Sequence, residues 1–287
     1  MSSAIAANEL DQFIRGITIP ACPQIMLDLL AEAGKVEPDM NRIGGLIRND
    51  PAHAASVLKL ANSPLFAPSK RIASISAAVT TLGIRNIMHI VSNIALRNSV
   101  QTEDVSERRM LEQFWDKATH TAEVAMLFAN ALPGMSKDDA YTCGLFHDSG
   151  IPILSLHFKY YLQRCDLSDV NWESILLSEE SCFGTNHAVV AYFFACNWKL
   201  PERICKAILL HHDASVFSYA SGTIDDEVRH LISLTILSKH ITAVLLGISE
   251  DARWNEVKLR AMEQLGLVRE EFKDITLDIL SELRERN

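Results

Sequence analysis

Apolar residues recur at helical spacing in short bursts through the first hundred residues of the chain. The runs at residues 25–30, 43–47 and 87–95 place their apolar side chains at i, i+3 and i+4, the spacing of one face of an amphipathic helix. Glycine and proline, at 12 and 9 of 287 residues, are scarcer than in an average chain. No useful stretch alternates apolar and polar residues as a half-buried strand does. The pattern therefore predicts an all-α protein.

Start and stop signals mark the ends of several of these helices. Asp50 supplies a side chain that can accept hydrogen bonds from a first helical turn, and Pro51 follows where its missing N–H costs nothing. This helix is expected to end before Pro64, because the residue that precedes a proline is pushed out of the α region. Gly83 separates two apolar runs, which indicates a left-handed backbone between two helices.

Further helical patterns fill the second part of the chain. They cover residues 114–131, 137–161, 172–178, 185–197, 201–211, 227–246 and 254–265. The acidic, polar run at residues 102–109 is the predicted joint, and it has no Gly or Pro tract of the kind that makes a linker flexible. We expect two helical lobes, an N-terminal domain at residues 1–105 and a second domain at residues 106–287.

Charge separates the same two parts. Residues 1–105 carry nine basic and nine acidic side chains, so the net charge of −9 falls on residues 106–287. A negative protein repels a phosphate backbone, and the helical pattern after Gly83 offers only Arg85 and Arg97 for phosphate contacts. Nucleic-acid binding is therefore not expected.

Membrane and secretory features are not expected either. The most apolar run, at residues 231–248, is interrupted by Lys239 and His240, which disfavours a membrane span. The first 15 residues lack a basic start followed by an apolar block, as a signal peptide would have. The six cysteines show no CxxC pairing, which fits a reduced compartment. The interpretation is a cytoplasmic protein.

Histidines gather in the second part, which holds eight of the ten. Imidazole and carboxylate groups are good ligands for Fe, Mn, Zn or Mg, and converging helices can present them together. The candidate metal ligands are His120, His147, Asp148, His187, His211 and His212. Other roles stay open, because His187 can equally be a core histidine that donates to a carbonyl, and the His211-His212 pair lies at a predicted helix end.

Two motifs around these residues resemble the HD metal-dependent phosphohydrolases. They are His120 within WDKATHTAEVA and the His-Asp pair within GLFHDSG, at residues 144–150. From about residue 19 to about residue 246 the chain is similar to the HDOD (HD-related output domain) family. That family shows Asp-Pro, Asn-Ser-Pro and Leu-Gly before its HD-like half, as here at residues 50–51, 62–64 and 82–83, and the match continues through Phe183-Gly184, Trp198 to Pro201 and His211-His212.

The HDOD resemblance implies a fold and a role. It implies an N-terminal helical bundle packed on an HD-like helical domain, with a bacterial signal-transduction output function. Such a protein acts by binding signalling proteins or a small signalling ligand. The resemblance also marks Asn62, Ser63 and Pro64 as a candidate interaction loop, although the same residues are explained by a simple helix stop.

The chain departs from catalytic HD enzymes at two places. Their His-Asp pair is usually followed by Gly-Lys, whereas Ser149-Gly150 follows here. A later helix normally contributes a metal-binding Asp, and the matching stretch offers Lys239 instead. An ammonium beside a divalent cation is repelled by several kcal/mol at low effective dielectric. Lys239 is therefore predicted to disrupt the site and to leave it degenerate.

The alternative function is a metal-dependent phosphohydrolase acting on a phosphomonoester, a nucleotide or a phosphodiester. In that case the candidate ligands hold one or two metals, and Glu179 or Glu180 acts as a base or orients a ligand. An HD-GYP cyclic-dinucleotide enzyme is disfavoured, because Asn186-His187-Ala188 stands where its signature would fall.

Overall fold

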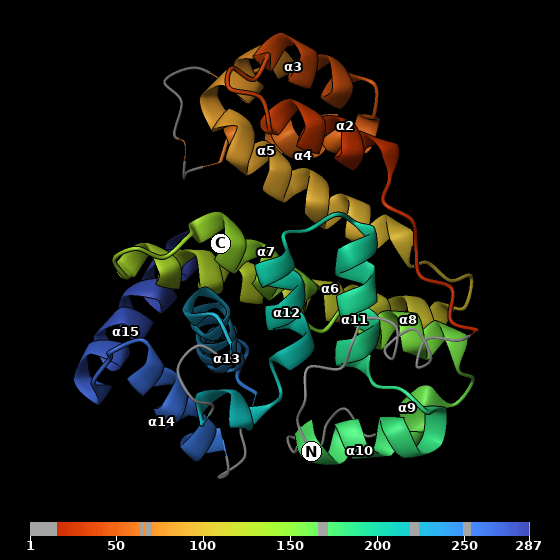
Figure 1. Cartoon of the computed structure of the whole chain (residues 1–287). Coiled ribbons are helices and arrows are strands. Elements are labelled where there is room, and N and C mark those ends of the chain that lie inside the picture. The colour runs from red at the N-terminus through yellow and green to blue at the C-terminus, as the bar shows by residue number, and fades with distance from the viewer. Residues whose placement is uncertain are drawn as a thin grey trace. The chain divides into compact units, whose positions relative to one another are not determined.

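The computed structural model describes residues 16–63, 66, 71–165, 172–218, 224–248 and 254–286. These residues form α-helices and a short 3-10 helix, with no strand among them (Figure 1). The predicted all-α fold is confirmed. Within the described ranges, no helix combines the length and the apolar character that a bilayer crossing needs.

The chain divides into two compact units. One comprises Ala21–Gln101 with Ser281–Asn287, and the other comprises Met1–Pro20 with Thr102–Leu280.

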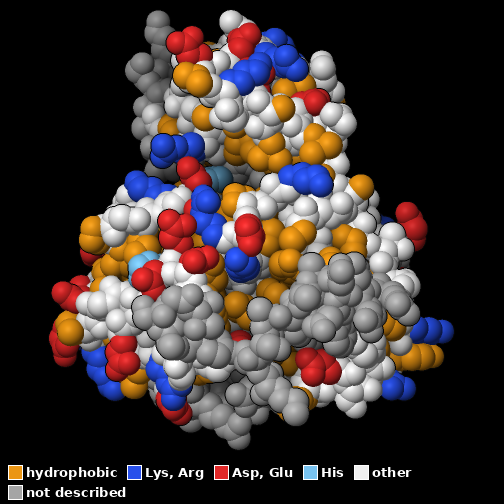
Figure 2. All heavy atoms as spheres, in the orientation of Figure 1, with side chains coloured by type: hydrophobic (Ala, Val, Ile, Leu, Met, Phe, Trp, Pro, Cys, Tyr) orange, Lys and Arg blue, Asp and Glu red, His pale blue; other side chains and the backbone are white. Residues whose placement is uncertain are grey.

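Among the described residues on the face shown in Figure 2, basic side chains are interspersed with acidic ones. The acidic excess is therefore not gathered into a single described region of that face.

In the range 21–101, the described residues of the first unit form four helices (Figure 1). They are α2 (Gln24–Ala33), α3 (Met40–Arg48), α4 (Pro51–Ala61) and α5 (Ile75–Ser99). The first three each pack against α5. Their apolar stripes supply a common core that includes Leu29, Ile43, Ile47, Val57 and Ile87, all fully buried.

The helix starts and breaks in this unit lie where the sequence signals predicted them. The Asp50 side chain accepts hydrogen bonds from the backbone N–H groups of Ala52 and His53, and α4 begins at Pro51 as predicted. Gly83 has φ +72° and kinks α5, which confirms the expected left-handed backbone. The predicted break is therefore real, although helical hydrogen bonding resumes directly after it and α5 continues to Ser99.

Asn62 ends α4 and closes the loop that follows. Its side-chain amide donates to the carbonyl oxygens of Leu58 and Ile72, each at 2.8 Å, and its Oδ1 accepts from the N–H of Ile72 at 2.8 Å. The helix stop is thus confirmed, and the Asn62 side chain holds the end of α4 and Ile72 together. Ser63 Oγ is buried without a hydrogen-bond partner, and Pro64 lies outside the described residues.

The second unit holds the remaining helices. They are α6 (Val105–Ala131), α7 (Lys137–Phe146), α8 (Gly150–His157), α9 (Tyr161–Arg164), α10 (Trp172–Phe183), α11 (His187–Asn197), α12 (Glu202–Leu210), the 3-10 helix η2 (Ala214–Phe217), α13 (Asp226–Leu246), α14 (Trp254–Gln264) and α15 (Arg269–Arg286), whose last turn extends past the unit's end at Leu280.

Helix α13 is the central element of the second unit. Helices α6, α7, α12 and α14 pack against it, and nearly every residue from Val228 to Ala243 is buried. A helix that is buried on all sides needs apolar residues all round. Residues 231–243 of the most apolar run therefore lie largely in the core of this unit, whereas Val244, Leu246 and Ile248 are exposed.

Two expectations about this unit need correction. The helix expected at residues 114–131 begins earlier, at Val105, because Asp104 caps α6 and Glu107 stands in its first turn, where a carboxylate stabilises the helix end. The pattern at residues 137–161 is not one helix but α7, α8 and α9, separated at His147–Ser149 and again at Phe158–Tyr160.

Candidate functional site

Two glycines allow the helices around the His147-Asp148 pair to approach closely. A Cβ added to Gly144, on α7, would lie 2.9 Å from the Cα of Ala122 on α6. A Cβ added to Gly150, at the start of α8, would overlap the carbonyl oxygen of His187 and lie 2.8 Å from its carbonyl carbon. Glycine at both positions therefore lets α7 rest on α6 and α8 rest on the start of α11.

Asp148 lies in the short turn between α7 and α8 and is the centre of a buried cluster. Its Oδ2 is 2.8 Å from His147 Nε2, and its Oδ1 is 3.0 Å from His211 Nε2. His187 Nε2 and His212 Nε2 lie further from Oδ1, at 3.6 and 3.8 Å. Asp148, His187, His211 and His212 each offer one ligand atom, and these four atoms lie within 4.8 Å of one another.

Hydrogen bonds fix the ring orientation of three of these histidines. His147 Nδ1 is 2.8 Å from the Gly144 carbonyl oxygen, and His211 Nδ1 is 2.6 Å from that of Ile208. A carbonyl oxygen only accepts, so each Nδ1 carries the proton and donates, and in the neutral ring Nε2 is left with its lone pair. Such pinning of the remote nitrogen is typical of metal-bound histidine.

His187 is held in the same way by a buried carboxylate. Glu179, on α10, accepts from His187 Nδ1 at 2.8 Å and from the His187 backbone N–H at 2.9 Å. The Tyr161 hydroxyl donates to the same carboxylate. With Nδ1 protonated, His187 Nε2 accepts from His212 Nε2, which lies 3.0 Å away.

The charge states of the cluster follow from burial. Burial lowers the pKa of all three histidines. The pKa of His147 is lowered, that of His211 falls to about 3, and that of His212 falls well below its ordinary value. Burial alone would raise the pKa of Asp148, but the electrostatic interactions around it, including that of the Lys239 ammonium, outweigh burial and hold that pKa well below 3.8. Asp148 is therefore a carboxylate among histidines that resist protonation. His211 lies at the C-terminal end of α12, as expected, and burial lowers its pKa although a helix C-terminus favours the charged ring.

Lys239 enters this cluster from α13. Its Nζ donates to Asp148 Oδ2 at 3.0 Å and lies 3.4 Å from Oδ1, and the side chain is 8% exposed. Burial lowers the pKa of Lys239, and the attraction of Asp148 opposes that shift. The pair forms a buried ion pair at the position that the sequence comparison with HD enzymes indicated.

The residues fit a divalent metal in donor chemistry but not in charge. Four nitrogen and oxygen donors converge, and two of the rings are oriented as metal ligands are. Asp148 is the single carboxylate of this group, and the Lys239 ammonium already neutralises it. A dication on the same carboxylate would repel that ammonium strongly in a buried site. The four donors could therefore bind a divalent metal only without the Lys239 ammonium beside them.

His120 lies outside this group. Its Nδ1 donates to the Asp116 carbonyl oxygen one turn earlier on α6, at 2.7 Å, and its ring is half-buried. His147 adjoins the group through Asp148 but is not one of its four members. The structure thus brings His187, His211, His212 and Asp148 together, with Lys239 beside them.

Among the carboxylates proposed to assist, Glu179 has the orienting position and Glu180 does not. Glu180 accepts from the Asn186 side chain near the surface, at 2.7 Å. Asn186 in turn caps α11, through a hydrogen bond from the Val189 N–H. Tyr161 was missed by sequence reasoning, because a single tyrosine carries no spacing signal that points to a buried glutamate.

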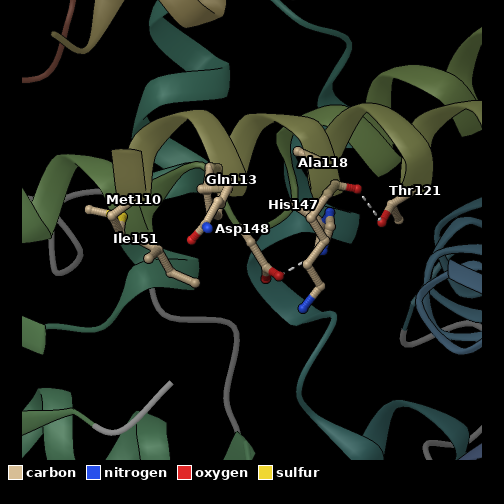
Figure 3. Close-up of a pocket in the computed structure, with 9 residues that line it drawn as sticks. Met110, Gln113, Ala118, Thr121, His147, Asp148 and Ile151 are labelled. Atoms are coloured by element: carbon tan, nitrogen blue, oxygen red, sulfur yellow. Dashed lines mark hydrogen bonds and ion pairs between the residues drawn. The ribbon is translucent and has the colours of Figure 1, made fainter. Parts of the chain in front are cut away.

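A cavity of about 220 Å³ opens beside the cluster. Figure 3 shows Met110 and Ile151 toward one end, with Asp148 and His147 lying further along beneath α6. Met110 and Gln113 of its wall were also missed, because the predicted helix began at residue 114, whereas α6 begins at Val105.

The fold and the motifs define a family. The family model of the HDOD domain matches residues 19–214, and the chain belongs to the HDOD family. Over 199 residues the chain is 27% identical to an uncharacterized protein of Treponema pallidum (strain Nichols), which covers 68% of this chain and 38% of that protein. The chain thus spans well under half the length of that relative.

Solved structures share the fold over nearly the whole chain. An HDOD domain protein of unknown function from Geobacter sulfurreducens has a TM-score of 0.69 at 22% identity, covering 96% of this chain and 94% of that one. A Shewanella amazonensis protein provisionally assigned as a phosphohydrolase gives 0.68 at 19% identity, with 97% and 94% covered. A Marinobacter aquaeolei protein provisionally assigned to signal transduction gives 0.65 at 21% identity, with 99% and 61% covered. These likenesses establish the fold.

Proposed function

We propose that this chain is a bacterial signal-transduction output protein that binds a signalling protein or a small signalling ligand and does not hydrolyse phosphate esters. The contact that carries the proposal is the 3.0 Å ion pair between Lys239 Nζ and Asp148 Oδ2. The ammonium supplies the positive charge that Asp148 needs in a buried site. Membership of the HDOD family and the likeness to a protein assigned to signal transduction agree with it.

The hydrogen bonds of the other donors support the same proposal. His187 and His212 satisfy each other through an N–H···N bond of 3.0 Å, which uses the lone pair that His187 would give to a metal. Asp148 is neutralised by Lys239. Two of the four donors thus have a partner of their own, and a third has its charge balanced, within the protein.

One observation favours the second candidate, a metal-dependent phosphohydrolase. The neutral rings of His147 and His211 turn their Nε2 lone pairs toward Asp148 oxygens at 2.8 and 3.0 Å. Two acceptors at such distances call for a proton or a cation between them. In this candidate Asp148, His187, His211 and His212 would hold a metal, which supplies Lewis acidity and lowers the pKa of bound water.

Metal analysis separates the two candidates. Protein purified without chelator is analysed by mass spectrometry as wild type, as Lys239→Asp and as the double variant His147→Ala, Asp148→Ala. We expect less than stoichiometric metal and no hydrolysis of 4-nitrophenyl or bis(4-nitrophenyl) phosphate in the wild type. Lys239→Asp should gain metal, because it replaces the ammonium by a carboxylate.

Two results would contradict the proposal. Stoichiometric metal in the wild type that disappears in the double variant would establish the metal site, and turnover of either ester would then establish the hydrolase. Unchanged metal content in a folded Lys239→Asp protein would show that Lys239 is not what excludes the metal. Circular dichroism and thermal melting of each variant show which proteins are folded.

A further inference from the structure

The cavity beside the cluster has an apolar end and a polar end. Met110, Phe114 and Ile151 contribute apolar side chains, while Lys117, Gln113 and Asp148 contribute polar ones. Figure 3 shows Met110 and Ile151 together at one end, away from His147. Ligand sites commonly combine an apolar wall with a small number of polar groups in this way.

The charged side chains at the polar end determine which sign of charge a ligand should carry. Lys117 and Asp148 are the charged side chains among the described residues that line the cavity. Asp148 is paired with Lys239, whose Nζ lies 3.0 Å from Asp148 Oδ2. Because Lys239 neutralises Asp148, the charge of the Lys117 ammonium favours an anion at this end of the cavity.

The volume limits how much of a ligand the cavity can enclose. A cavity of about 150 Å³ takes up benzene, or about 25 Å³ for each non-hydrogen atom. At that ratio the 220 Å³ here hold about nine non-hydrogen atoms. A nucleotide has more than twice that number, roughly, so it would not be enclosed by this cavity.

We infer that the cavity binds a small organic carboxylate, with its apolar body between Met110, Phe114 and Ile151 and its carboxylate at Lys117. The inference rests on the proposed function, because it assigns the small ligand that a metal-free site would bind. A carboxylate has two oxygens, which the Lys117 ammonium and the Gln113 amide can serve. A phosphate dianion brings a second negative charge and a third oxygen toward Asp148, which disfavours it.

Three isosteric probes of nine non-hydrogen atoms test the sign of charge. Benzoate, benzamide and benzamidine carry one negative charge, no charge and one positive charge on the same ring. Each is titrated into the full chain in EDTA, by calorimetry and by ligand-observed NMR. We expect benzoate to bind with a Kd on the order of a millimolar or tighter, benzamide about tenfold more weakly, and benzamidine not at all.

A matched pair of lysine variants tests the position. Lys117→Met removes the charge and keeps the length of the side chain, whereas Lys206→Met removes a lysine on α12 that pairs with Glu202 and is not among the residues lining the cavity. Lys117→Met should bind benzoate and benzamide equally well, and Lys206→Met should behave as the wild type. Thermal melting confirms that both variants are folded.

The outcomes keep the two proposals apart. Equal affinity for benzoate and benzamide, absence of benzoate binding, or full binding in folded Lys117→Met would overturn the carboxylate site and leave the proposed function standing. Tighter binding of phenylphosphonate than of benzoate would overturn the assignment of a carboxylate. Binding that needs added Mn²⁺ and is lost in His211→Ala would overturn both proposals, because the ligand would then be held by a metal.

Discussion

Replacing Gly150 by alanine should destabilise the candidate site by forcing the backbones of α8 and α11 apart. The new Cβ would overlap the carbonyl oxygen of His187 and lie 2.8 Å from its carbonyl carbon, whereas ordinary contact begins at 3.4 Å. The obstructing atoms are backbone, so no side-chain rotation relieves the overlap, and α8 must move away from α11. Any part of that movement that the start of α11 takes up displaces His187 and disturbs its 3.0 Å hydrogen bond with His212.

The magnitude follows from two opposed effects. Overpacking a close-packed core costs about 1–3 kcal/mol, and a backbone clash belongs at the upper end of that range. Alanine in place of glycine in a helix returns up to about 1 kcal/mol. We therefore expect Gly150→Ala to lose about 2 kcal/mol of unfolding free energy. Gly45→Ala in α3 is the control, because its Cβ would approach nothing closer than Arg48 Nη2 at 3.9 Å, and it should be neutral or slightly stabilising.

Urea unfolding followed by circular dichroism measures the two free energies. Histidine NMR signals of the folded variant report separately whether the His187 environment has changed. A Gly150→Ala protein as stable as the Gly45→Ala control, with unchanged histidine signals, would refute the close approach of α8 and α11 on which the site geometry depends.

Three further predictions concern single side chains. Glu32 is buried and accepts a hydrogen bond from Lys35, which lowers its pKa. Its carboxylate therefore stabilises the fold above its unfolded pKa, and Glu32→Gln should be less stable than the wild type at neutral pH. In urea unfolding at a series of pH values, that difference in stability should shrink as the pH falls below about 4.5. Asn62→Ala removes three hydrogen bonds, two of them to Ile72, and should cost about 2–3 kcal/mol in the same assay, whereas a cost near zero would contradict the loop closure. Tyr161→Phe takes one donor from the buried Glu179 and should cost about 1.5–3 kcal/mol; unchanged stability would show that the bond contributes nothing net.

Local signals sufficed for the fold class and for many helix ends. Asp50-Pro51 predicted the start of α4 because a cap and a proline act within one turn, and Gly83 predicted a left-handed backbone for the same local reason. Helix α15 was not predicted, although Phe272, Ile279 and Leu283 are buried at helical spacing. Its apolar positions are diluted among charged residues, so the signal is weak in a short window.

The candidate site was only partly accessible from sequence. The donor residues were identified by motif, and Lys239 was singled out because an ammonium stood where a carboxylate was expected. Which donors meet is a property of helix packing: His120 faces its own helix, whereas His187 and His212 come together across 25 residues. The cavity could not be predicted, because its wall combines residues 110–121 of α6 with Ile151 of α8.

The contact between Gly150 and the His187 carbonyl also has a mechanical side. Ile151, the next residue along α8, faces the cavity, while Gly150 rests directly on the first residue of α11. Close-packed backbone has no slack to absorb a shift. A ligand that displaced Ile151 would therefore also shift Gly150 against the His187 backbone, so this contact couples the cavity wall mechanically to the start of α11.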